Sequence, residues 1–240
     1  MPSRKFTTSI VVGVAAIAVG GGSYGIVSAA TSSGSAPASS ASPGASSGSS
    51  GGPASGGGGS NARSGPAAGG SVGTVSSLSA SGFTLTTSAG QKVTVKEASS
   101  TSYEKGTTSA TVSAVTAGEP VLVLGTTSGT TITATQVIVQ PANSGSSASS
   151  EAQVVPFQRG APSTSKQVGQ IPANYTQGSG AIVSGMAATK ATEAALASYP
   201  GGVVDRVVRL SNGEYEVHNI GVNWPHHIFV SQNFQVVGAN

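Results

Sequence analysis

Apolar and polar positions of residues 72–140 are arranged in short runs that end at glycines. The runs are rich in β-branched residues and lie at 73–78, 82–87, 92–95, 121–124 and 131–139. Apolar residues at every second position, as in 82–87 and 92–95, are typical of strands with one buried face. Gly90 and Gly129 fall between successive runs, where hairpin turns are expected. The pattern predicts a small all-β barrel of five strands, with Phe83 and Leu85 on one face opposite Val93 and Val95.

A helical pattern followed by strands occupies residues 186–240. Residues 187–199 predict a helix with one apolar stripe, and Pro200-Gly201-Gly202 ends it. Asn212-Gly213 is typical of a two-residue hairpin turn. The strands expected around and after this turn lie at 203–210, 214–220, 227–231 and 234–237. The sequence therefore predicts a small α+β domain, in which a helix precedes an antiparallel sheet.

The first 71 residues have a different character. Arg4 and Lys5 precede an uncharged apolar stretch at 9–30, which is typical of an export signal and is also long enough for a single transmembrane helix. We expect residues 1–30 to be a signal peptide or a membrane anchor, and the sequence leaves both alternatives open. Residues 31–71 consist mostly of Ser, Gly, Ala and Pro, which predicts a disordered stalk.

Residues 141–185 are also polar and are expected to form a linker between the two folded regions. An apolar patch at 154–157 predicts one docked segment within it. The whole chain is thus expected to be multidomain, with an OB-like barrel at 72–140 and an α+β domain at 186–240. We expect an exported bacterial protein of the cell envelope, either anchored in the membrane or secreted.

Composition narrows the chemistry available to these regions. The chain of 240 residues contains no cysteine, which excludes disulfides, thiolate metal sites and a cysteine nucleophile. Its net charge of +3 comes from the leader and linkers, because the charges within 72–140 cancel and those within 188–240 sum to about −1. Neither folded region is expected to carry a basic face, so binding of nucleic acid is not expected.

Two motif patterns resemble known domains. Gly-x-Val, Phe-Thr-Leu-x-Thr and the later Val-x-Val runs of 73–139 resemble an OB-like barrel domain of unknown function in exported bacterial proteins. Tyr-Pro-Gly-Gly at 199–202, the Asn-Gly turn and Tyr215-Glu216-Val217 resemble a PepSY domain, although the turn at 222–227 departs from its pattern. The PepSY resemblance implies an inhibitory or protein-binding module without catalysis of its own.

Candidate chemistry concentrates near the C-terminal end of the sequence. His218, His226 and His227 are the three histidines, and three imidazoles can hold zinc or copper. Neighbouring positions of a strand point to opposite faces, so His226 and His227 are not expected to converge on one ion. We expect no cofactor, no metal and no catalytic residue. Trp224 is expected to plug the sheet with one edge exposed, and Trp224, His226 and His227 form the candidate binding surface.

These observations favour a non-catalytic envelope protein that binds or modulates another envelope protein, such as a peptidase. Its membrane contact would run through residues 9–30 if the leader is retained. Two alternatives remain. One is a metal-binding envelope protein that uses the histidines, and the other is a protein that binds carbohydrate or the cell wall through the barrel.

Overall fold

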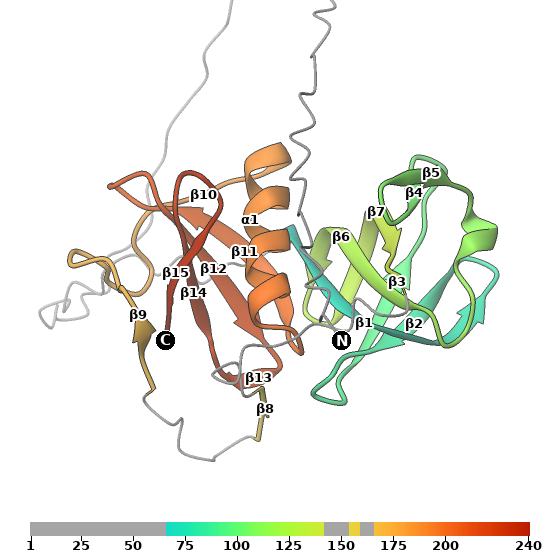
Figure 1. Cartoon of the computed structure of the whole chain (residues 1–240), viewed down its shortest axis with the longest axis horizontal. Helices are drawn as coiled ribbons and strands as arrows, with labels where there is room; N and C mark the ends of the chain where they lie inside the picture. The colour runs from blue at the N-terminus through green and yellow to red at the C-terminus, as the bar shows by residue number, and fades with distance from the viewer. Residues whose placement is uncertain (1–65, 142–153, 159–165) are drawn as a thin grey trace, which may run out of the picture. The chain divides into compact units, whose positions relative to one another are not determined.

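The computed structural model of the chain describes residues 66–141, 154–158 and 166–240 (Figure 1). The predicted leader at 1–30 and the predicted stalk as far as residue 65 lie outside the described residues. Among the helices that the structure does describe, none has the length and apolar character needed to cross a membrane.

Five strands close into a barrel, which confirms the prediction for residues 72–140 at this level. β1 pairs with β2 and β6, β2 pairs with β3, and β7 joins β3 in parallel and β6 in antiparallel orientation. The five strands are β1 (Ala67–Ser79), β2 (Gly82–Thr86), β3 (Lys92–Lys96), β6 (Pro120–Ser128) and β7 (Thr131–Val139). Closure pairs both edges of every strand, which removes the open edges of a flat sheet.

The barrel interior follows the predicted alternation. Phe83 pairs with Val95 and Leu85 pairs with Val93, and all four side chains are buried in one apolar cluster. The threonines between them, such as Thr94, face outward. The alternate apolar positions of these strands thus form the barrel core, as a period of two requires.

The sequence pattern did not predict the hairpin of β4 (Ser102–Lys105) and β5 (Thr108–Ala110), nor the short 3₁₀ turn η1 (Val112–Ala114). β4 pairs in parallel with β7, and its Tyr103 packs partly buried against the barrel core. Ser-Tyr-Glu-Lys has no apolar alternation, so local pattern gives no sign of this strand.

One helix and an antiparallel sheet make up the C-terminal region. The sheet runs in the order β11, β12, β14, β15. The elements of this region are α1 (Gly185–Ser198), β11 (Val203–Arg209), β12 (Tyr215–Ile220), β14 (His227–Val230) and β15 (Val236–Ala239). The last strand begins two residues later than predicted, because Phe234 adopts a positive φ of 58° in the turn before it.

The helix buries the predicted alanine stripe. Ala188, Ala191 and Ala195 are fully buried and pack with Leu196 against the sheet, where Val207 and Val217 belong to the same cluster. Alanines on the contact face let the helix axis approach the strands closely.

The two predicted folded regions are joined by β1. Its first half pairs with β11, with Gly70 opposite Val204 and Ser71 opposite Val203. Leu122 and Leu124 of β6 belong to the same buried cluster as the inner face of α1, and α1 stands beside these strands in Figure 1. The described residues all belong to one compact unit. This arrangement differs from the expected pair of modules on flexible linkers.

The described part of the expected linker at 141–185 also takes part in the fold. It contains β8 (Val155–Pro156), β9 (Val168–Gly169) and β10 (Ala181–Ile182), which pair with β13 (Val222–Trp224), β15 and β11 respectively. The predicted docked segment at 154–157 thus includes β8.

The junction at the start of β1 depends on two glycines. A Cβ atom on Gly69 would overlap the carbonyl oxygen of Val204, and one on Gly70 would overlap the carbonyl oxygen of Val123. The Ser71 hydroxyl donates to the carbonyl of Gly202 at 2.9 Å. Only glycine permits β1 to approach its neighbours this closely on both sides.

We predict that Gly70→Val lowers the free energy of unfolding by about 2–3 kcal/mol, because the added side chain must displace β6 or α1. Urea unfolding of the full chain, followed by far-UV circular dichroism, measures the effect. Ala117→Val, at an exposed turn of the barrel, is the matched control and is expected to change stability by less than about 0.5 kcal/mol. Equal stability of the two variants would contradict the close approach at Gly70.

Candidate functional site

The second face of the C-terminal sheet is covered by residues 170–180, which we call the cover segment. α1 packs on one face of β11, β12 and β14, and the cover segment packs on the other. Ile171 and Tyr175 contact Leu210 and Phe229 there, and the Tyr175 and Phe229 rings meet edge to face at 4.7 Å. The sheet is therefore buried on both faces.

An unusual set of ionisable side chains lies beneath the cover segment. Arg206, His218 and His227 stand in register across β11, β12 and β14. Glu216 lies two positions from His218 on the same strand and is only 1% exposed. Asp205 joins this face because β11 is bulged between residues 204 and 206. We call Asp205, Arg206, Glu216, His218 and His227, with the adjacent His226, the acid–histidine cluster.

Asp205 and His218 form the first pair of this cluster. The His218 Nδ1 atom lies 2.5 Å from Asp205 Oδ1 and 3.0 Å from Arg206 Nη1. One nitrogen cannot donate to the carboxylate and accept from the guanidinium at once, and the shorter distance assigns an Nδ1–H that donates to Asp205. Arg206 Nη1 is 3.8 Å from the same carboxylate oxygen, and no described residue gives the buried Nε of Arg206 a hydrogen-bond partner.

Glu216 and His227 form the second pair, next to Tyr175. His227 Nδ1 donates to Glu216 Oε1 at 2.6 Å, and the Tyr175 hydroxyl lies 3.1 Å from the same nitrogen. Burial, together with the charge of Glu216, holds the pKa of Tyr175 above its usual range. The second carboxylate oxygen, Glu216 Oε2, is buried and has no hydrogen-bond partner among the described residues.

His226 completes a group of three touching imidazole rings. Its ring centroid lies 4.3 Å from that of His218 and 5.0 Å from that of His227. Burial, with smaller contributions from His218 and His227, lowers the pKa of His226 to about 4. His226 precedes β14, so the alternation of faces along a strand does not apply to His226 and His227, and their rings lie in contact.

Contact between the rings does not make a metal centre. Within residues 66–141, 154–158 and 166–240, no group of three or more His, Asp or Glu side chains is arranged to hold an ion. The two Nδ1 atoms that form pairs are directed at carboxylates instead. The described geometry gives no support to the metal-binding alternative.

The structure places the candidate binding surface of Trp224, His226 and His227 largely inside the protein. Trp224 is 2% exposed, packs edge to face with Tyr199, and donates its indole N–H to the carbonyl of Lys166 at 2.7 Å. His227 is 8% exposed, and only His226 is partly accessible. Trp224 is buried because the segments around residues 155 and 166 pack over it, where a sheet without them would leave its ring exposed.

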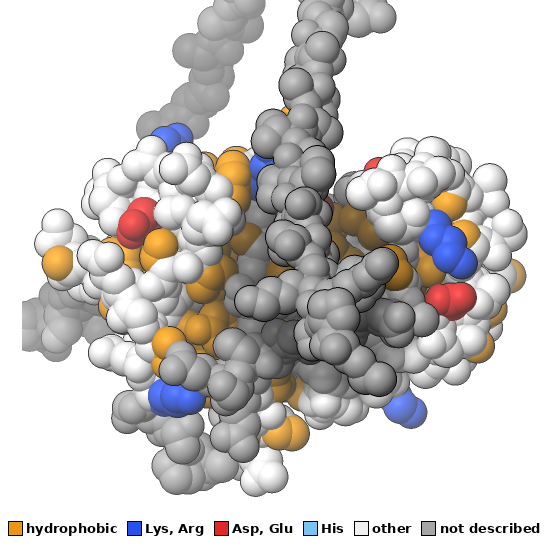
Figure 2. All heavy atoms as spheres, in the orientation of Figure 1, with side chains coloured by type: hydrophobic (Ala, Val, Ile, Leu, Met, Phe, Trp, Pro, Cys, Tyr) orange, Lys and Arg blue, Asp and Glu red, His pale blue; other side chains and the backbone are white. Residues whose placement is uncertain are grey.

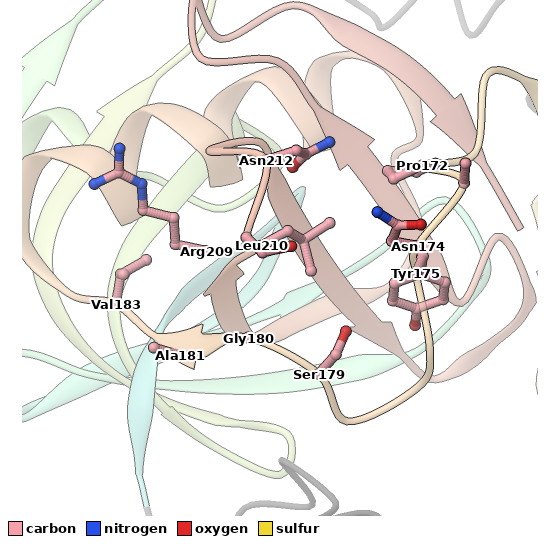
Figure 3. A pocket seen from close by; sticks show the side chains of 12 residues that line it. Pro172, Asn174, Tyr175, Ser179, Gly180, Ala181, Val183, Arg209, Leu210 and Asn212 are labelled. Carbon is pink, nitrogen blue, oxygen red and sulfur yellow. The ribbon is translucent and has the colours of Figure 1, made fainter.

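A pocket of about 570 Å³ lies where the cover segment meets the end of β11 (Figure 3). Leu210 lies centrally among its lining side chains, with Pro172, Asn174 and Tyr175 on one side. Gly180 has φ of 88°, and a Cβ atom there would collide with β11, so this glycine lets the wall of the pocket approach the strand. Arg209 is the single charged residue of the lining, and its side chain in Figure 3 extends away from Tyr175.

Sequence reasoning missed Asp205, Arg206 and Tyr175. One signal for the first two was present, since Asp-Arg interrupts the valines of a strand that is otherwise apolar on both faces. Such a strand is buried on both faces, and its charged residues then need partners on neighbouring strands. Tyr175 gave no signal, because its neighbours are polar and aperiodic.

The chain was compared with family models, curated proteins and solved structures. No family model matches the chain, and neither the search of curated proteins nor the search of solved structures finds a match.

We predict that His226 makes the protein less stable in acid. Its pKa is about 4 in the folded protein and near 6.5 when unfolded, so the unfolded state binds more protons between these values. The contribution of His226 to the free energy of unfolding therefore falls as pH decreases from 6.5 to 4. Because the ring is partly exposed, we expect a loss of about 1 kcal/mol.

Urea unfolding at pH 7 and pH 4 measures this loss. The decrease in stability should be about 1 kcal/mol smaller in His226→Gln than in the unmodified chain, since glutamine does not titrate. An equal decrease in both proteins would show that His226 is not desolvated as described.

Proposed function

We propose that the folded unit is a non-catalytic binding module of an exported cell-envelope protein, and that it binds or modulates another envelope protein. An exported peptidase is the candidate partner. The observation that carries this proposal is the pocket between the cover segment and β11. Its volume of about 570 Å³ and its mixture of apolar side chains with a few polar ones fall within the usual range for ligand sites.

The arrangement of the elements supports the two domain resemblances. A five-stranded barrel whose third and last strands, β3 and β7, pair in parallel supports an OB-like fold for residues 72–140. A helix followed by an antiparallel sheet, with Tyr215-Glu216-Val217 in its second strand, supports a PepSY-like fold for 186–240. The step from PepSY resemblance to protein binding is an analogy between folds.

The geometry of the acid–histidine cluster supports binding rather than catalysis. Its two carboxylate–histidine pairs lie beneath the cover segment, so a ligand in the pocket meets Asn174, Ser179 and Asn212 instead. A general acid or base must reach the proton that it transfers, and these buried pairs do not face the pocket.

Charge distribution favours a protein ligand over a polyanion. On the face shown in Figure 2, Lys, Arg, Asp and Glu side chains stand apart rather than gathering in a patch of one sign. Binding of nucleic acid or of an anionic polymer depends on such a patch. A protein ligand can instead use the apolar lining of the pocket.

In this proposal, the leader and stalk hold the folded unit outside the cytoplasm. A leader at 1–30 would export the chain or anchor it, and a stalk that ends before β1, at residues 31–65, would span roughly 30 Å as a flexible coil. The folded unit would then act outside the cytoplasm at some distance from the membrane.

The proposal is tested by filling the pocket. Ala173 lines it and is exposed, so Ala173→Trp should occupy its volume without disturbing a core. A photo-cross-linking amino acid at Asn212, on the rim of the pocket, should capture a specific envelope protein in intact cells.

We expect Ala173→Trp to reduce this cross-linking at least tenfold. Ala117→Trp, at an exposed turn of the barrel, is the matched control and should leave cross-linking unchanged. Cross-linking that persists in Ala173→Trp, or attachment to cell-wall polysaccharide instead of a protein, would contradict the proposal.

A further inference from the structure

We infer that the acid–histidine cluster is an acid-sensitive latch, which releases the cover segment from the sheet and so dismantles the pocket when the surroundings become acidic. The inference concerns regulation of the site described under the proposed function. Its test follows the cover segment directly and needs no partner, so it can fail or succeed independently of that function.

The charges of the cluster explain the direction of the response. β11 supplies Asp205 and Arg206, β12 supplies Glu216 and His218, and His227 lies on β14. With neutral imidazoles the cluster carries two negative charges and one positive charge, and one proton shared among the histidines balances it. The backbone oxygen of Asn240 accepts from the main-chain N–H groups of both His226 and His227.

Protonation of all three histidines would give the cluster more positive charges than its two carboxylates can balance. Three imidazolium rings within 4.3–5.3 Å of one another, beside Arg206, would give four cations against two carboxylates. Like charges in contact repel strongly where water is excluded, and unpaired buried charge is costly. Burial is the main cause of the lowered pKa of His226, and repulsion from His218 and His227 lowers it further.

Two buried polar atoms of the cluster are not satisfied by hydrogen bonds within the described residues. Glu216 and Arg206 are more than nine-tenths buried, and Glu216 Oε2 and Arg206 Nε have no hydrogen-bond partner within the described part of the chain. Water that entered beneath the cover segment would solvate these atoms and the imidazolium rings together. Release of the cover segment is therefore the change that gives water access to these buried groups.

The cover segment contains no helix or strand of its own, and the flanking strands β9 and β10 each pair with the sheet over two residues. The Gln170 N–H donates to the Val237 carbonyl of β15 at 2.8 Å, and within the segment Tyr175 N–H donates to Pro172 and Ser179 N–H donates to Thr176. Across the sheet it is held by Tyr175, through the Phe229 ring and His227 Nδ1. The opposite face of the same sheet packs on α1 in the larger apolar cluster. Local opening of the cover segment leaves that packing intact.

Hydrogen exchange of the full chain at pH 7 and pH 5, corrected for the intrinsic effect of pH, tests the inference. We expect protection of the Tyr175 and Ser179 amides to fall at least tenfold at pH 5, while amides of β2 and β3 keep theirs. Unchanged protection of the cover segment would overturn the inference. So would an equal loss in the barrel strands, since that would mean global unfolding.

Two variants identify the source of the effect. His226→Gln removes an imidazole that burial keeps neutral and that gains a proton once water reaches it, so the loss of protection at pH 5 should shrink at least threefold. Glu119→Gln removes a carboxylate from the barrel and is the matched control, expected to behave as the unmodified chain. If His226→Gln loses as much protection as the control, the cluster is not the latch.

Discussion

The close approach of β1 to both β6 and β11 is the constraint on which the rest of the structure depends. At Gly69 and Gly70 a side chain as small as a methyl group would overlap the carbonyl oxygens of the neighbouring strands. Because these positions are glycine, one strand belongs to the barrel and to the C-terminal sheet. α1 then packs in the angle between them, in an apolar cluster to which both regions contribute.

This junction accounts for how a protein without cysteine holds two small folded regions together. Each region alone would have a small core, and small cores give little stability. β1 and the cluster around α1 join the two regions, because this cluster includes Val72, Leu122 and Leu124 of the barrel strands. The Thr127 hydroxyl, which donates to the carbonyls of Ala67 and Val204, ties the same three strands together.

The other face of the C-terminal sheet differs from the face that packs on α1, because it buries ionisable side chains as well as apolar ones. It carries five ionisable side chains in the space that apolar residues would fill, and the cover segment lies over them. Buried ion pairs seldom stabilise a fold more than apolar side chains of the same size do. The shared core around α1 supplies stability, whereas the covered face offers the pocket and a means of controlling it.

The sequence predicted those parts of the fold that depend on local periodicity. Alternating residues of β2 and β3, the alanine stripe of α1 and the turn at Asn212-Gly213 all follow from neighbours in the chain. Residues 67–72 showed no strand pattern, because the Ala, Gly and Ser residues there are small. They permit close approach of the neighbouring strands instead of burying large side chains. The cover segment, the convergence of His226 with His227 and the burial of Trp224 depend on contacts between distant parts of the chain, which no local pattern encodes.

The central claim, that β1 unites the two regions, is tested most directly by fluorine NMR of the full chain labelled with fluorophenylalanine. Phe83 reports on the barrel core and Phe229 on the C-terminal sheet. Titration with urea at neutral pH should abolish both native signals at the same midpoint. Loss of one native signal while the other persists would contradict a shared core and would indicate two independent domains.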